Sequence, residues 1–225
     1  MEWRSGKRGW ERWLWIWAFT LTIGTGLGFT STVIAQPVVM VLGDSLSAGY
    51  GLAQGTGWVD LLRTQMARDG LEFKVVNASI SGETTLGGRN RLAKLLTTWK
   101  PVIVVVELGA NDGLRGTDLA TTRANLDAIL EAATNAGAAA LVIGMRLPPN
   151  YGADYGRRFH ALFGEVAKTH KAGYVPFLLD GFAEQRGQFQ DDGVHPRAEA
   201  QPAMLATVYR ELKPMLERLR KKTAG

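Results

Sequence analysis

Three side chains that could together cleave an ester bond lie at opposite ends of this sequence. Ser45 follows the apolar run Val38–Leu42 in GDSLSAGYG, whereas Asp192 and His195 lie near the other end, in DDGVHP. A serine hydroxyl becomes a nucleophile when a histidine takes its proton, and an acid orients that histidine. A four-residue turn brings its ends within about 7 Å, so the Asp192 carboxylate can reach the His195 ring.

Each of these residues also has a purely structural interpretation. Asp44 or Ser45 could simply cap the segment that follows the apolar run, and Asp-x-x-His also fits an ordinary turn. Asp191 competes as the acid, but it falls outside the four-residue turn. The other two histidines, His160 and His170, lie in a helical pattern among basic residues, and we expect both at the solvated surface.

Acyl transfer also needs hydrogen-bond donors for the oxyanion that forms during attack. The backbone N–H of Ser45 lies at the start of the segment after the apolar run, often a helix N-terminus. Gly82, in SISGETT, lets the backbone approach a ligand closely. Asn111, in GAND, offers a side-chain amide. A turn glycine and a loop-capping asparagine are the structural alternatives.

Apolar runs and amphipathic segments alternate along the chain, which predicts the elements that position these residues. The runs are expected to be strands, at Val38–Leu42, Phe73–Val76, Val102–Val106, Leu141–Gly144 and Tyr174–Leu178. The segments between and after them are expected to be helices, at Trp58–Arg68, Gly88–Trp99, Leu119–Ala136, Asp154–His170 and Pro202–Arg220. The pattern predicts an α/β fold with a parallel sheet between two helical layers.

Glycine-rich polar segments follow the predicted strands. They are GDSLS, NASISGETT, ELGANDG and RLPPNYG, with DDGVHP after the last strand. Ligands of parallel sheets bind beyond the carboxyl ends of the strands. We therefore expect the candidate serine, histidine, acid and oxyanion donors to meet at one edge of the sheet.

The first 35 residues differ from the rest of the chain. A basic head is followed by the apolar stretch Leu14–Phe29 and by STVIAQP, the layout of a secretory signal cut after Ala35. The stretch is shorter than the ~20 residues of a spanning helix, although an uncleaved anchor remains the alternative. We expect residues 1–35 to be a signal peptide, residues 36–225 to be one domain, and the mature protein to be periplasmic or extracellular.

The composition restricts the classes of function that need consideration. The sequence of 225 residues contains no cysteine, which excludes disulfides, thiolate zinc sites and a cysteine nucleophile. Residues 36–225 hold 22 Lys and Arg against 19 Asp and Glu, a net charge of +3. This excess is weak and no basic-aromatic interleaving accompanies it, so we expect no nucleic-acid partner.

Four blocks of the sequence together resemble the SGNH, or GDSL, hydrolase family. They are GDSLSAGYG, SISGETT, GAND and DGVHP, in the order of the family. GDSLS lacks the second glycine of the G-x-S-x-G elbow of α/β-hydrolases, so the design differs from theirs. The longer strings VVNASISGET, ELGANDGLRG and DDGVHPRAEAQP are similar to the branch of secreted bacterial arylesterases, lysophospholipases and acyl-CoA thioesterases I.

The resemblance implies a flavodoxin-like α/β/α sandwich with five parallel strands and no metal or cofactor. It implies Ser45 as the nucleophile, His195 and Asp192 as the rest of the triad, and Gly82 and Asn111 as oxyanion donors with the Ser45 amide. The segment RLPPNYGADYGRRF is similar to a substrate-contacting loop of this branch. We therefore expect substrate contacts from Asp44 and from three residues of that loop, Pro149, Asn150 and Tyr151.

The favoured function is a secreted serine esterase for single acyl chains, with thioesters as possible further substrates. Its partner would be a small-molecule or lipid ester, with transient contact to a membrane surface. A carbohydrate O-deacetylase on the same fold and a non-catalytic membrane-tethered binding protein are the alternatives. A nucleotide-binding module is disfavoured, because neither G-x-G-x-x-G after the first apolar run nor G-x-x-x-x-G-K-[ST] occurs.

Overall fold

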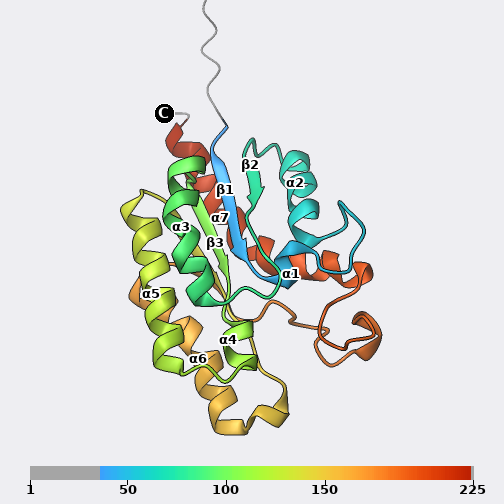
Figure 1. Cartoon of the computed structure of the whole chain (residues 1–225). Helices are drawn as coiled ribbons and strands as arrows, with labels where there is room; N and C mark the ends of the chain where they lie inside the picture. The colour runs from blue at the N-terminus through green and yellow to red at the C-terminus, as the bar shows by residue number, and fades with distance from the viewer. Residues whose placement is uncertain (1–35, 224–225) are drawn as a thin grey trace, which may run out of the picture. The chain divides into compact units, whose positions relative to one another are not determined.

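A five-stranded parallel sheet forms the centre of the computed structural model, which describes residues 36–223 (Figure 1). The strands are β1 (Val38–Gly43), β2 (Lys74–Asn77), β3 (Ile103–Glu107), β4 (Ala139–Ile143) and β5 (Gly173–Val175). Their order in the sheet is β2-β1-β3-β4-β5, and every neighbouring pair is parallel. The predicted α/β fold is confirmed. The proposed leader, residues 1–35, lies outside the described residues.

The centre of the sheet is buried on both faces, as the uninterrupted apolar runs predict. Every residue of β1 and of β3 is buried, including Glu107 at the carboxyl end of β3. Val41 pairs with Val105, and Gly43 with Glu107, so the two strands end side by side. The segments that follow β1 and β3 therefore start next to each other.

Helices cover both faces of the sheet. The longer helices are α2 (Trp58–Arg68), α3 (Thr85–Trp99), α5 (Leu119–Asn135), α6 (Ala153–Thr169) and α7 (Gln201–Thr223). Helices α2 and α7 pack against each other on one face, and α3, α5 and α6 pack side by side on the other (Figure 1). This arrangement makes the predicted three layers.

Two short helices were not predicted, and both carry candidate site residues. Helix α1 (Ser45–Ala48) follows β1, and helix α4 (Ala110–Leu114) follows β3. Four or five residues are too few to produce a helical period in the sequence. Helix α3 begins three residues before its predicted start, because the Thr84 hydroxyl accepts a hydrogen bond from the backbone N–H of Gly87 and caps it.

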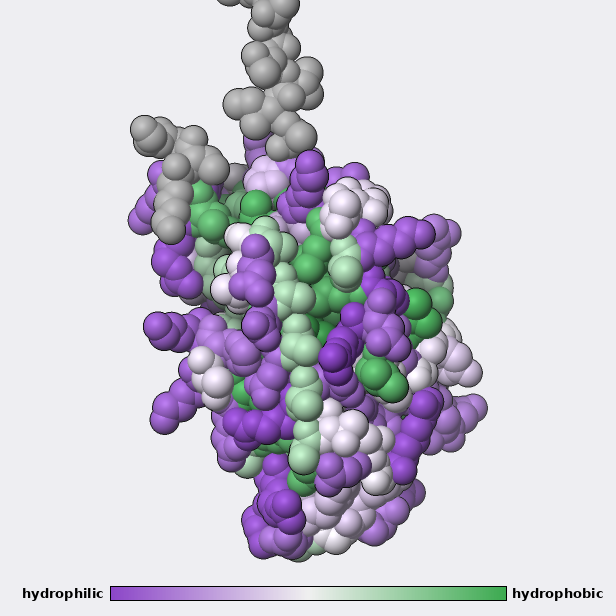
Figure 2. All heavy atoms as spheres, turned by 60° about the vertical axis from the view of Figure 1, so that its left-hand side comes forward, coloured by the Kyte–Doolittle hydropathy of each residue, from purple (hydrophilic) through white to green (hydrophobic). Residues whose placement is uncertain are grey.

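The surface has the character expected of helices whose apolar sides face a sheet. On the face shown in Figure 2, hydrophilic side chains predominate and hydrophobic ones form separate patches. Within residues 36–223, none of the helices combines the length and the apolar character that crossing a membrane requires.

Candidate active site

Ser45 is held at a sharp corner between β1 and α1. The Asp44 carboxylate caps α1 by accepting a hydrogen bond from the backbone N–H of Leu46 at 3.0 Å. Gly43, the last residue of β1, has no room for a side chain, since a Cβ there would lie 2.7 Å from the Ser47 Cβ. Both the capping expectation and the strand-end expectation for this segment are met, and Ser45 remains partly exposed.

Ser45, His195 and Asp192 form a continuous chain of hydrogen bonds. The Asp192 carboxylate lies 2.7 Å from the Nδ1 atom of His195, and the Nε2 atom lies 2.8 Å from the Ser45 hydroxyl. Because an ionised carboxylate can only accept, Nδ1 carries the proton and Nε2 is left to accept from Ser45. The structure thus brings together the three residues predicted from opposite ends of the chain.

The loop that carries Asp192 and His195 is organised by local backbone contacts. The second oxygen of Asp192 accepts hydrogen bonds from the backbone N–H groups of Val194 and His195, at 2.9 and 3.0 Å. These two bonds, followed by the contact with the His195 ring, lower the pKa of Asp192 to about 2. Gly193 adopts a positive φ of 67°, which favours glycine. Asp191, the competing acid, pairs instead with Arg197.

Two of the three predicted oxyanion donors are backbone N–H groups without an acceptor. Among residues 36–223, no atom accepts a hydrogen bond from the N–H of Ser45 or of Gly82. Gly82 lies in the exposed loop after β2, with a φ of 78°. Both groups are therefore available to a ligand.

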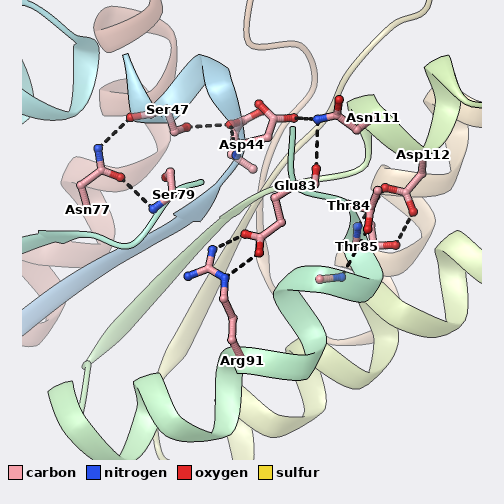
Figure 3. Close-up of polar contacts among 12 residues, drawn as sticks. Asp44, Ser47, Asn77, Ser79, Glu83, Thr84, Thr85, Arg91, Asn111 and Asp112 are labelled. Carbon is pink, nitrogen blue, oxygen red and sulfur yellow. Dashed lines mark hydrogen bonds and ion pairs between the residues drawn. The ribbon is translucent and has the colours of Figure 1, made fainter. Parts of the chain in front are cut away.

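The third predicted donor, the Asn111 amide, already has two acceptors. It donates to the Asp44 carboxylate at 3.1 Å and to the backbone carbonyl of Glu83 at 2.9 Å (Figure 3). An amide nitrogen has two hydrogens, so a ligand would have to share or replace one of these bonds. The same two bonds tie α4 to the corner before Ser45 and to the loop that contains Gly82.

A buried aspartate fixes α4 against the start of α3. Asp112, directly after Asn111, accepts hydrogen bonds from the backbone N–H and the hydroxyl of Thr85, at 2.8 and 2.5 Å. Thr85 in turn accepts from Asn125 on α5 (3.2 Å). These contacts place the Asn111 helix independently of any substrate.

The four predicted substrate-binding residues lie in two different environments. Asp44 is only 1% exposed, so its side chain lies below the surface and serves the corner and Asn111. Pro149, Asn150 and Tyr151 form a short 3₁₀ helix after β4, in which the first two are exposed. The Tyr151 hydroxyl donates to the backbone carbonyl of Leu114, which places this segment beside the end of α4.

The expectation for the two other histidines is wrong. His160 and His170 are half-buried, and each has a polar partner in another segment of the chain. His160 Nδ1 lies 3.1 Å from the carbonyl of Met145, and His170 Nε2 lies 2.9 Å from Asp127. The helical pattern gave their spacing but not the side of α6 that faces the core.

Three polar residues at the corner were missed in the sequence: Ser47 and Glu107, which are buried, and Asn77, which is half-buried. The Ser47 hydroxyl donates to Glu107 at 2.7 Å, and Asn77 donates to the Ser47 carbonyl at 2.7 Å. Asn77 also accepts from the backbone N–H of Ser79 (Figure 3). A glutamate that ends a continuous apolar strand, as in VVVELG, was the available sequence clue.

Gln190 is a further residue that the sequence reasoning missed. Its side chain donates to the backbone carbonyl of Tyr50 at 2.8 Å, while its backbone N–H donates to the His195 carbonyl. Gln190 therefore links the histidine loop to the segment that follows Ser45. The spacing of glutamines in the sequence gives no indication of this contact.

Exposed apolar side chains lie close in the sequence to the site residues. The large hydrophobic side chains that are exposed in the described part of the chain all belong to segments that carry site residues. They are Tyr50, Ile80, Leu86, Leu114 and Val194. We call these five residues the apolar rim. The Tyr50 ring lies 4.5 Å from the His195 ring, centroid to centroid.

The site contains no set of side chains suited to a metal ion. Within residues 36–223, no group of three or more His, Cys, Asp or Glu side chains is arranged to hold one. The groups that remain for a ligand are the Ser45 hydroxyl with its His195 partner and the N–H groups of Ser45 and Gly82, which have no acceptor within residues 36–223. Such an arrangement provides a nucleophile, a base and anion-binding donors.

Comparison with known proteins identifies relatives along almost the whole described chain. Residues 41–203 match the model of the GDSL-like lipase/acylhydrolase family. The Pseudomonas aeruginosa protein named Esterase TesA is 46% identical over 182 residues, which cover 81% of this chain and 90% of that protein. The Escherichia coli protein named Thioesterase 1/protease 1/lysophospholipase L1 is 38% identical, over 83% of this chain and 88% of that protein.

A solved structure with the same architecture has a clear sequence likeness as well. The psychrotrophic esterase EstA from Pseudoalteromonas, in a structure inhibited by monoethylphosphonate, superimposes with a TM-score of 0.77. The sequences are 36% identical, and the match covers 81% of this chain and all of that one, 100%. Fold and sequence therefore point to the same set of relatives.

Proposed function

The chain belongs to the GDSL-like lipase/acylhydrolase family and is a carboxylic ester hydrolase, and we propose that Ser45, His195 and Asp192 perform its chemistry through an acyl-enzyme. The observation that carries this proposal is the unbroken chain of hydrogen bonds from Asp192 through His195 to Ser45. It ends at a partly exposed hydroxyl, and the N–H groups of Ser45 and Gly82 have no acceptor within residues 36–223. No metal or cofactor is needed for this chemistry.

In the first half of the reaction, the Ser45 oxygen attacks the ester carbonyl carbon while its proton passes to His195 Nε2. The carbonyl electron pair moves to oxygen and gives a tetrahedral oxyanion. When the carbon–oxygen bond to the leaving alcohol breaks, the alcohol takes the proton from His195. The ionised Asp192 stabilises the imidazolium and keeps the ring oriented through both transfers.

The oxyanion is held by the N–H groups of Ser45 and Gly82 and by the Asn111 amide. The two backbone groups are free to donate at once. Asn111 must redirect one hydrogen from Asp44 or from the Glu83 carbonyl. We place this exchange in the transition state, because the negative charge of the oxyanion, which makes the new hydrogen bond favourable, develops only there.

In the second half, water replaces the serine. His195 takes a proton from water, the resulting hydroxide attacks the acyl carbon, and the same donors hold the second oxyanion. The bond to the Ser45 oxygen then breaks, the serine recovers its proton from His195, and the carboxylic acid leaves. The reaction is ping-pong, with water as the second substrate.

A single acyl chain is the substrate class that the apolar rim favours. Five exposed hydrophobic side chains in the segments next to Ser45, Gly82, Asn111 and His195 suit an alkyl or aryl group better than a carbohydrate. The names of two relatives, which include arylesterase and lysophospholipase, also support an acyl-chain substrate. The likeness to an acetyl-xylooligosaccharide esterase, at 19% identity, extends to the fold alone. Carbohydrate deacetylation is therefore the second candidate.

Oxygen esters are proposed as the working substrates, with thioesters as a side capacity of the same site. Both pass through the same tetrahedral oxyanion, so the site can hydrolyse either. The predicted leader would place the enzyme outside the cytoplasm, away from acyl-CoA. A net charge of +3 for residues 36–225 also gives no strong attraction for a multiply charged leaving group.

The proposal is tested by Ser45→Ala with a phosphonate probe. We expect loss of ester turnover by about 10⁶-fold, as for other serine nucleophiles, and loss of labelling by a fluorophosphonate, with an unchanged far-ultraviolet circular dichroism spectrum. Ser81→Ala, a change of the same size in the exposed loop before Gly82, should keep both activities. Appreciable turnover or labelling by folded Ser45→Ala would refute the assignment.

The substrate class and the location need separate measurements. A series of p-nitrophenyl esters of increasing chain length should show kcat/KM rising beyond acetate, whereas a deacetylase would be fastest on acetate and on acetylated sugars. A matched oxygen ester should surpass its acyl-CoA counterpart. Cell fractionation with mass determination should find a protein that begins at Gln36, outside the cytoplasm; an uncleaved cytoplasmic form that prefers acyl-CoA would contradict both proposals.

A further inference from the structure

Glu107 is a fully buried carboxyl group that the proposed reaction does not use. It ends β3 beside Gly43 and is 0% exposed. One of its oxygens accepts hydrogen bonds from the Ser47 hydroxyl at 2.7 Å and from the backbone N–H of Asp44 at 3.3 Å. Its other oxygen, Oε1, is buried and receives no hydrogen bond within residues 36–223.

The surroundings of Glu107 are unsuited to a second negative charge. Its neighbour Asp44 is a carboxyl group that is itself only 1% exposed. Among the described residues, the ion pairs include neither Asp44 nor Glu107, and the one group that becomes cationic near them is His195, which acts on Asp44. Two adjacent buried carboxyl groups that lack an ion-pair partner cannot both remain ionised.

We propose that Glu107 is a positioning residue that acts in its protonated, neutral form, and that it holds the corner before Ser45 by binding Ser47 and Asp44. Asp44, as the ionised member of the pair, then holds Leu46 and Asn111. The contacts connect the buried acid pair to the nucleophile on one side and to an oxyanion donor on the other.

The electrostatics of the pair agree with this placement of the proton. Burial raises the pKa of Glu107 well above its ordinary value, and the charge of Asp44 raises it further. Burial also raises the pKa of Asp44, but the Leu46 N–H, the neighbouring Glu107 carboxyl group, the His195 charge and the Asn111 amide all oppose that rise. The proton of the pair therefore resides on Glu107.

A neutral Glu107 has a consequence for the oxyanion. The Asn111 amide donates to Asp44, and in the proposed mechanism it also donates to the oxyanion. One negative charge behind this amide can be tolerated, because the Asp44 charge also holds the amide in place. A second charge on Glu107 would repel the oxyanion through a low-dielectric interior, where such repulsion is strong.

Kinetics of three variants test the role of Glu107, an arm that rests on the proposed function. Glu107→Gln keeps the shape and the neutrality of the protonated acid, so kcat at pH 7 should stay close to that of the wild type. Glu107→Ala removes the hydrogen bonds to Ser47 and to the Asp44 N–H. With the active sites counted by fluorophosphonate titration, kcat should fall by about 10²-fold while KM changes little. Glu72→Gln, on the exposed surface, is the matched control and should leave both constants unchanged.

Infrared spectroscopy tests the protonation of Glu107 without any substrate. The difference spectrum between wild type and Glu107→Gln at pH 7 should contain a carbonyl stretching band of a protonated carboxyl group, which Glu72→Gln retains. This arm also serves if Glu107→Ala fails to fold. The absence of the band, or a Glu107→Gln variant as slow as Glu107→Ala, would overturn the proposal. If the wild type hydrolyses no ester, the proposed function fails, and the band still decides the state of Glu107.

Discussion

The nucleophile and the base of this site are held by two regions that are built in different ways. The corner around Ser45, residues 43–47, follows a buried strand and is fixed by Glu107 and Asn77, which lie far away in the sequence. The histidine loop, residues 190–195, is exposed and is fixed by hydrogen bonds within itself. The position of the serine depends on the assembled core, whereas the position of the histidine depends on a local turn.

The carboxyl groups of the two regions respond to their surroundings in opposite directions. Asp192 is a partly exposed acceptor for two N–H groups, which lower its pKa to about 2, so its stabilising contribution is lost as the pH falls below its ordinary 3.8. Asp44 and Glu107 are buried, which raises their pKa values, so the folded state loses stability as the pH rises above their ordinary values. Backbone hydrogen bonds keep the acid of the triad ionised down to a pH of about 2, and burial gives the corner a neutral acid.

The largest effect in this comparison is expected in the histidine loop, from Asp192→Asn. Oδ1 of Asp192 serves two backbone N–H groups, so the amide oxygen of the asparagine should take that place and present its NH₂ to His195 Nδ1. The ring would then carry its proton on Nε2 and could not accept from Ser45, and kcat should fall by about 10⁴-fold.

Asp192→Ala sharpens this prediction because it removes the acid without forcing the wrong tautomer. It should be less harmful than Asp192→Asn, with water accepting from Nδ1 and from the Val194 and His195 N–H groups, which lose their acceptor in this variant. Thermal unfolding of both variants shows whether the turn is kept. Steady-state kinetics of both variants decide the matter. Equal losses would mean that the charge of Asp192, rather than the tautomer that it selects, is what the loop provides.

The next effect belongs to the corner. Asn111→Ala should reduce kcat by about 10² to 10³-fold with little change in KM, because an oxyanion donor acts mainly in the transition state. Thermal unfolding must accompany the kinetics, since the same amide ties α4 to Asp44 and to Glu83. A change in KM alone would mean that Asn111 only binds substrate, and a large loss of stability with normal kcat would make it a structural tie.

A smaller effect concerns stability and pH. In the unfolded chain Glu107 ionises near its ordinary pKa of 4.5, whereas the folded chain keeps it protonated. Unfolding therefore releases a proton above that pH, and the wild type should lose up to about 1.4 kcal/mol per pH unit from this group. Glu107→Gln removes this pH dependence. The free energy of unfolding of the variant, minus that of the wild type, should therefore increase as the pH rises.

Urea unfolding of both proteins over a series of pH values measures this difference. Asp44 is present in both, so its own contribution cancels to a first approximation. A difference that does not vary with pH would mean that Glu107 ionises in the folded protein as it does in the unfolded chain. That result would also remove the contrast between a neutral corner and a charged loop.

The local part of the fold could be predicted from the sequence. The pattern gave Trp58–Arg68 without error and placed all five strands, because each element leaves its own period in the chain. The turn at Asp192 and His195 was equally local, and the four blocks resembling a known family joined it to Ser45. Hydrogen bonds that cross the sheet leave no period, so Glu107, Ser47 and Asn77 could not be identified in this way.

The orientation of side chains could not be predicted from the sequence either. His160 and His170 have the spacing of helix residues, but which neighbours they meet depends on how α6 packs. Asp44 follows the strand as predicted, yet its side chain points into the corner rather than toward a substrate. In both cases the deciding partners come from segments distant in the sequence, which spacing alone does not specify.

Gln190 connects the two regions, and its substitution should have the smallest effect of those considered. Its side chain donates to the Tyr50 carbonyl at 2.8 Å, next to the ring that contacts His195. Gln190→Ala removes this bond and the longer one to the Pro196 carbonyl at 3.3 Å, but it leaves the turn and its backbone contacts. We therefore expect kcat to fall only a few-fold and the stability by about 1 to 2 kcal/mol. Gln188→Ala, whose side chain makes no hydrogen bond within residues 36–223, is the matched control. Gln190→Ala combined with Glu107→Ala tests whether the loop and the corner are positioned independently. If they are, the fold losses of kcat should multiply. A loss clearly smaller or larger than that product would mean that Gln190 couples the local turn to the corner, and the division between the two regions would not hold.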